Sequence, residues 1–202
     1  MAAALPRPRS SGTGWRAVAV VQLVGFAVLA WICGSAWATT ATSQPMPPPE
    51  IAAALPTVAL QGRGNLRFFG LAVYEARLWA AAGFEVERYE KQPFALELRY
   101  ARALTGPAIA ERSLVEMRRG GSFDDEQARI WQLAMTRAFP DVAPGDRISG
   151  LHYPDGTTRF FHNGQPTTVL VDAAFARRFF GIWLASTTSE PGLRRQLIGQ
   201  SP

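Results

Sequence analysis

The 202-residue chain is 48% hydrophobic, has one cysteine and carries a formal net charge of +5. This length suits one domain with a substantial core. Removal of the N-terminal signal predicted below takes away three of the 21 basic residues and none of the 16 acidic ones, which lowers the net charge to +2. A nearly neutral domain is not expected to bind nucleic acid. Cys33 leaves with the signal, which excludes an internal disulfide and a cysteine nucleophile or metal ligand.

Residues 1–38 have the order of a secretory signal peptide. Three arginines precede an apolar run at 17–32, and Ala36 and Ala38 occupy the small positions of an A-x-A cleavage site. We therefore predict cleavage after Ala38 and a periplasmic protein. The alternative is an uncleaved signal that anchors the protein in the membrane. The apolar run has 16 residues, fewer than the roughly 20 that span the hydrocarbon core, so no stable membrane insertion is expected after cleavage.

Residues 39–50, TTATSQPMPPPE, contain four prolines and no large aliphatic residue, which predicts a linker. The domain is expected to cover residues 51–202. Residues 57–79 are rich in β-branched, aromatic and glycine residues, and apolar residues alternate with others from Phe94 to Tyr100. Both patterns are typical of half-buried strands, so we expect the first half of the domain to be mostly sheet.

Two helices are expected next. Pro107 suits a first helical turn, and Gly120 and Gly121 would end that helix. Ser122, followed three residues later by Asp125, resembles a capping box and would open a second helix that reaches Ala138.

The pattern of strands returns after Gly145. Three short strands are predicted at about 146–153, 157–162 and 165–171, and the last two are joined by a two-residue Asn-Gly turn at 163–164. Asp172 can cap a helix whose buried face would hold Phe175, Phe179 and Trp183. A short helix at about 190–198 ends the chain. This order implies an α+β fold with an antiparallel sheet covered by helices on one face.

Few residues suggest a metal or cofactor site. His152 and His162, the only histidines, fall on neighbouring predicted strands and could share a metal with a carboxylate, but no other ligand cluster accompanies them. Neither a metal nor a cofactor is therefore expected. Arg67 lies in a strand-like run with few polar residues, where an inward guanidinium would need an anionic or polar partner. An outward arginine on a half-exposed strand is the alternative.

Several short motifs resemble the chalcone isomerase-like superfamily, in particular its exported bacterial branch. They keep their order and spacing over most of residues 57–199. The motifs are G-x-G-x-L-R at 62–67, VYEA at 73–76, LRYARALTG at 98–106, GDR at 145–147, FFHNG at 160–164 and FFGIWL at 179–184. The resemblance implies an open-faced β-sandwich, in which a large antiparallel sheet carries helices on one face and an apolar ligand cleft lies between them.

Plant chalcone isomerases of this superfamily use an Arg, a Thr, a Tyr and an Asn around the substrate. The resemblance places Arg67, Tyr74, Ile109 and Glu116 at these positions. Ile109 cannot donate a hydrogen bond to a developing enolate, so the resemblance implies no catalytic residue for ring closure.

Another branch of the superfamily binds fatty acids through an Arg and a Tyr, and Arg67 with Tyr74 resembles that pair. Their separation of seven places the two side chains on opposite faces of a continuous strand. A bulge or turn at Gly70 would have to restore a common face.

Three functions follow as hypotheses. The first is a non-catalytic periplasmic binder of an apolar small molecule with an acidic head, such as a fatty acid, held by Arg67, Tyr74, Ile109 and Glu116. The second is an isomerase of the intramolecular lyase type, which would act on a chalcone-like or other phenolic substrate through Tyr74 and Glu116. The third is an accessory protein that acts through a protein partner. We expect Phe175, Phe179 and Trp183 to serve mainly the core, with one or two of these rings at the cleft wall.

Overall fold

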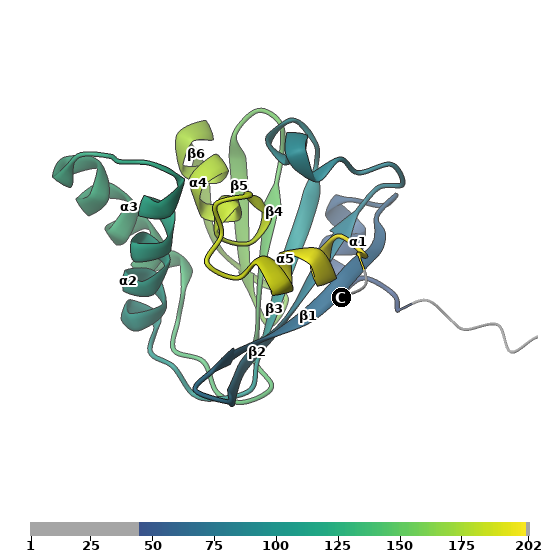
Figure 1. Ribbon diagram of the computed structural model, residues 1–202, viewed down its shortest axis with the longest axis horizontal. Coiled ribbons are helices and arrows are strands. Elements are labelled where there is room, and N and C mark those ends of the chain that lie inside the picture. The colour runs from purple at the N-terminus through teal and green to yellow at the C-terminus, as the bar shows by residue number, and fades with distance from the viewer. Residues whose placement is uncertain (1–44, 201–202) are drawn as a thin grey trace, which may run out of the picture. The chain divides into compact units, whose positions relative to one another are not determined.

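The computed structural model describes residues 45–200, so the predicted signal peptide and half of the predicted linker lie outside it. A six-stranded antiparallel sheet follows the chain in the order β1 to β6 (Figure 1). Its strands are β1 (Ala59–Phe68), β2 (Leu71–Ala80), β3 (Phe94–Tyr100), β4 (Arg147–His152), β5 (Thr157–His162) and β6 (Gln165–Val171). The α+β class and the open antiparallel sheet are confirmed.

Four helices pack on one face of this sheet: α2 (Gly106–Met117), α3 (Asp125–Ala138), α4 (Ala173–Leu184) and α5 (Pro191–Leu197). Two 3₁₀ segments, η1 (Val86–Lys91) and η2 (Arg118–Gly120), connect the larger elements. No helix within residues 45–200 is both long and apolar enough to cross a membrane.

The main core lies between the sheet and these four helices. Phe175, Phe179, Phe180 and Trp183 of α4 are all buried in it, together with Phe160 of β5. The Phe179 and Phe160 ring centroids are 5.2 Å apart, in an edge-to-face arrangement. The expectation that the aromatic residues of α4 belong mainly to the core is confirmed.

A short helix, α1 (Pro49–Ala54), covers the opposite face of the sheet. Ile51 of α1 packs with Trp79, Ala95 and Leu151 in a second, smaller hydrophobic cluster. Figure 1 shows α1 and α5 on opposite sides of the strands. The central strand β3 is therefore buried on both faces rather than half-buried. Since α1 begins at Pro49 and Glu50 is buried, the folded domain starts two residues before the boundary predicted at Ile51.

Of the two helix caps predicted from the sequence, one is present in the structure. Asp172 caps α4 as predicted, because its carboxylate accepts a hydrogen bond from the backbone N–H of Phe175 at 2.9 Å. The predicted capping role of Ser122 is wrong. Helix α3 begins at Asp125, and the residue before it, Asp124, accepts from the backbone N–H of Gln127 at 2.7 Å.

Two hairpins of the sheet have the same two-residue turn. The predicted turn between β5 and β6 has φ of 49° at Asn163 and 86° at Gly164. The turn between β1 and β2 has φ of 47° at Phe69 and 80° at Gly70. Asparagine followed by glycine is the preferred pair for this geometry, whereas a phenylalanine at the first position is unusual.

Candidate functional site

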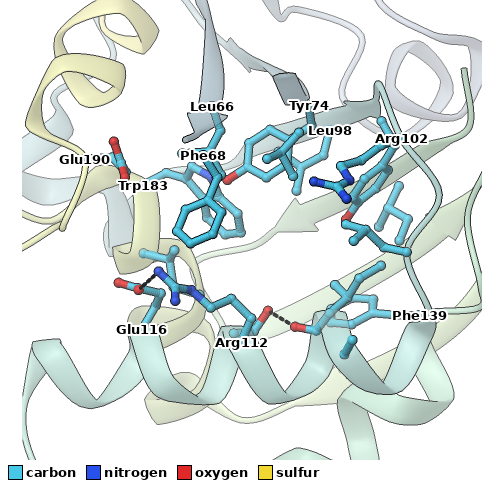
Figure 2. A pocket seen from close by; sticks show the side chains of 18 of the residues that line it. Leu66, Phe68, Tyr74, Leu98, Arg102, Arg112, Glu116, Phe139, Trp183 and Glu190 are labelled. Atoms are coloured by element: carbon cyan, nitrogen blue, oxygen red, sulfur yellow. Dashed lines mark hydrogen bonds and ion pairs between the residues drawn. The ribbon is translucent and has the colours of Figure 1, made fainter. Parts of the chain in front are cut away.

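A cavity of about 280 Å³ opens between strands β1–β4 and helices α2 and α4 (Figure 2). Most of its wall is apolar, and each of these elements contributes side chains to it. The lining residues are Leu66, Phe68, Val73, Tyr74, Leu98, Tyr100, Arg102, Leu104, Ala108, Ile109, Arg112, Ser113, Glu116, Phe139, Ile148, Phe179, Ile182, Trp183, Ser189 and Glu190. An apolar cavity with a few polar groups is the usual form of a small-molecule site.

The Tyr74 hydroxyl is one polar group of the cavity. The indole Nε1 of Trp183 donates a hydrogen bond to this oxygen at 2.9 Å, which leaves the phenolic proton of Tyr74 available for another acceptor. Burial raises the pKa of Tyr74 far above its ordinary value, and burial does the same for the pKa of neighbouring Tyr100. Both phenols are therefore neutral near pH 7 and suited to donate hydrogen bonds rather than to remove protons.

Glu116 is a buried carboxylate in the cavity wall and already has partners. Its Oε2 atom accepts hydrogen bonds from Arg119 Nε and Ser189 Oγ, both at 2.8 Å. Its Oε1 atom lies 2.7 Å from Arg112 Nη2, an ion pair that lacks the alignment of a hydrogen bond. The two arginines compensate the buried charge, and the Ser189 contact ties α2 to the segment after α4.

Arg102 and Arg112 place positive charge at the cavity. Both side chains are exposed, Arg102 on the segment after β3 and Arg112 on α2. In Figure 2 the Arg102 guanidinium points into the cavity, while that of Arg112 is joined to Glu116 on the opposite side. No ion pair or side-chain hydrogen bond within residues 45–200 engages Arg102, so its charge is available to a ligand.

Three of the four predicted site residues line the cavity: Tyr74, Ile109 and Glu116. Arg67 does not line it, so the predicted residues do not all share this cavity. In the β1–β2 ladder, Tyr74 pairs with Leu66, and the register shifts between Leu66 and Arg67. The Arg67 side chain is exposed on β1. Its Nη1 atom donates to the carbonyl oxygen of Gly70 at 3.1 Å instead.

The physical reason is the irregularity in register next to the turn. The tight turn at Gly70 pairs Arg67 with Ala72, which on a regular strand would share a face with Tyr74. The ladder shifts by one residue before the Leu66–Tyr74 pair, so Tyr74 lies on the cavity side with Leu66 and Phe68, and Arg67 lies on the other side. Arg102 was missed, although a signal existed in the sequence. It follows Tyr100 by two residues, which in an extended chain places both side chains on the same side.

The two histidines are not brought together. His152 pairs with Thr158, and His162 pairs with Ile148, so they lie at opposite ends of the β4–β5 hairpin. His152 is buried, with Nε2 3.0 Å from the carbonyl oxygen of Glu90, and burial lowers its pKa. Among the described residues, no group of three His, Cys, Asp or Glu side chains could hold a metal ion.

Comparison with protein families agrees with this architecture. The sequence model of a family described as chalcone isomerase-like matches residues 46–199. The chain belongs to the chalcone isomerase-like family. An uncharacterized protein of Haemophilus influenzae is 28% identical over 129 residues, which are 64% of this chain and 62% of that protein. The chain thus spans less than two thirds of the length of this relative.

The chalcone isomerase-like fold is also seen in a solved structure. The crystal structure of an Arabidopsis thaliana fatty-acid binding protein aligns with a TM-score of 0.54 and 12% sequence identity. The alignment covers 71% of this chain and 87% of the plant protein. At this level of identity the likeness shows a shared fold.

Proposed function

We propose that the protein is a non-catalytic binder of an apolar molecule with an acidic head, such as a fatty acid. The observation that carries the proposal is the apolar cavity at which Arg102 has no ion pair within residues 45–200 and the phenol of Tyr74 is neutral. The fatty-acid binding activity of the Arabidopsis protein with the same fold supports the same ligand class. Burial of an alkyl tail would contribute about 0.8 kcal/mol per CH₂ group.

The acidic head of the ligand would lie between Arg102 and Tyr74. A carboxylate there would accept a charge-assisted hydrogen bond from Arg102 and the phenolic proton of Tyr74. A bond of the first kind contributes about 1.5 to 3 kcal/mol. Arg112 is less available because Glu116 already shares its charge. Since the raised pKa keeps the Tyr74 phenol neutral, this phenol should not make binding depend on pH between about 6 and 9.

Replacement of Arg102 tests the site directly. Arg102→Ala should weaken binding of a fluorescent fatty acid by about tenfold or more, equivalent to about 1.4 kcal/mol, because the head loses its charged partner. The matched control is Arg67→Ala, which removes an equally exposed arginine that lies outside the cavity and should bind normally. A titration in which Arg67→Ala loses affinity and Arg102→Ala does not would contradict this placement. Mass spectrometry of lipid extracted from protein purified without detergent would identify the bound class.

An isomerase is the second candidate, because Tyr74 and Glu116 share one cavity. Their surroundings argue against it: the Glu116 carboxylate is held by its ion pairs, and the raised pKa of Tyr74 makes this phenol a poor source of a base at neutral pH. We expect ring closure of a chalcone to proceed at the same rate with the protein as in buffer. A faster rate that disappears in Tyr74→Phe would favour the isomerase.

We also propose that the protein is exported to the periplasm and that the mature chain starts at Thr39. The support is the A-x-A pattern of Ala36 and Ala38 after the apolar run. Intact-mass measurement of protein from the periplasmic fraction should give the mass of residues 39–202. A mass that retains Trp37, or recovery only in the membrane fraction, would favour the uncleaved anchor.

A further inference from the structure

The tip of the β1–β2 hairpin exposes three large apolar side chains beside the cavity. Phe68, Phe69 and Leu71 are 55%, 90% and 61% exposed. The two phenylalanine rings pack edge to face with their centroids 4.5 Å apart. Phe68 is also part of the cavity wall, where it lies close to Leu66 and Trp183 (Figure 2). The apolar tip is therefore continuous with the apolar cavity.

The backbone at Phe69 is strained, and packing within the domain does not compensate the strain. A bulky residue with positive φ is a conformational outlier that costs stability. The other two-residue hairpin of the chain adopts the same geometry with Asn163, which tolerates it. Phe69 is 90% exposed, so packing of its ring contributes little to stability. The turn itself is also open, because a side chain added at Gly70 would meet no atom within 4 Å. The fold therefore does not explain the phenylalanine.

Two arginines lie next to the tip. Residues 51–74 contain no acidic residue, and Arg67 lies within the hairpin. Arg102 lies on the segment that hydrogen-bonds to the start of β2. On the neighbouring loop, Asp141 and Asp146 are occupied by hydrogen bonds from within the domain. Exposed aromatic and aliphatic side chains flanked by arginines are typical of segments that bind the interface of an anionic bilayer.

We propose that this hairpin tip docks on the surface of an anionic lipid bilayer. Phe69 and Leu71 enter the headgroup region, and Arg67 contacts lipid phosphates. The cavity then opens next to the bilayer, so that an apolar ligand passes between membrane and protein along Phe68 without crossing water. The transfer step rests on the proposed function, whereas the docking step does not.

Flotation of the processed protein with vesicles tests the docking. The vesicles are phosphatidylcholine alone or phosphatidylcholine with phosphatidylglycerol, and binding should be stronger to the second. Phe69→Asn should lower the vesicle partition coefficient by about tenfold, because a large exposed ring no longer leaves water. The same substitution should raise the melting temperature, since it installs the residue that the β5–β6 hairpin uses. The loss of binding then cannot come from unfolding.

Val171→Thr is the matched control. Val171 is an exposed apolar residue, 76% accessible, on β6 at the opposite end of the sheet, and its replacement should leave flotation unchanged. Equal flotation of wild type and Phe69→Asn would overturn the proposal, as would a lower melting temperature of Phe69→Asn. Loss of self-association in Phe69→Asn without any vesicle binding would show a contact between copies instead.

A second measurement distinguishes membrane docking from ligand binding in the cavity. Phe69→Asn should bind a water-soluble fluorescent fatty acid with wild-type affinity but take it up more slowly from vesicles. Absence of fatty-acid binding in every variant would overturn the proposed function and leave the docking result standing. Equal uptake rates from vesicles in wild type and Phe69→Asn would overturn the role of the tip in transfer.

Discussion

Phe179→Ala should lower the free energy of unfolding by about 3 to 5 kcal/mol. Phe179 is 5% exposed, and its ring centroid lies between 5.2 and 5.9 Å from those of Phe139, Phe160 and Phe175. Removal of the ring leaves a void between α4 and the sheet that these rigid rings cannot fill. Urea unfolding followed by circular dichroism measures the change.

The matched control for Phe179→Ala is Val169→Ala, at an exposed apolar position on β6. It should change the free energy of unfolding by no more than about 0.5 kcal/mol. Because Phe179 also lines the cavity, fatty-acid binding should be compared at a temperature where the variant is folded. A Phe179→Ala protein with wild-type stability that fails to bind ligand would show that the ring serves the cavity alone.

Local chemistry made much of the sheet and helix order predictable. The Asn163-Gly164 pair determines its own hairpin, and Asp172 determines the start of α4 through one hydrogen bond three residues away. Short-range signals of this kind do not depend on the rest of the fold. The hairpin turn at Phe69 was harder to predict because its first residue is not one that the geometry prefers.

The candidate site could be predicted only in part. Tyr74, Ile109 and Glu116 line the cavity, whereas Arg67 lies outside it because the β1–β2 register shifts between the Arg67–Ala72 and Leu66–Tyr74 pairs. Helix α1 was not predicted, because its first two residues belong to the segment 39–50, whose prolines predicted a linker. Its position depends on Glu50, whose main partner lies 97 residues further along the chain.

That partner, Arg147, is central to a polar network beneath α1. Arg147 Nη2 donates to both carboxylate oxygens of Glu50, at 2.9 and 3.0 Å, and the Ser149 hydroxyl donates to Glu50 Oε1 at 3.0 Å. Arg147 Nε also lies 4.0 Å from Oε1 of Glu97, a fully buried carboxylate. Trp79 Nε1 donates to the other oxygen of Glu97, whereas Oε1 accepts no hydrogen bond. Arg147 thus compensates Glu50, shares the compensation of Glu97 with Arg99, whose Nη2 lies 3.7 Å from the same Oε1, and fastens α1 to the sheet.

Arg147→Met should therefore lower the free energy of unfolding by about 3 to 5 kcal/mol, since it leaves buried charge without its partner. Trp79, which α1 helps to cover, should shift its fluorescence to longer wavelength as the helix detaches. Arg88→Met is the matched control, because the Arg88–Glu85 pair is well exposed, with a 3.4 Å separation, and should contribute at most about 1 kcal/mol.

A further comparison distinguishes lost charge compensation from lost packing. Addition of Glu50→Gln to Arg147→Met removes the carboxylate that loses its main partner, so the double variant should recover part of the stability lost in Arg147→Met alone. A loss of stability that Glu50→Gln does not reduce would mean that Arg147 holds α1 mainly through its alkyl chain.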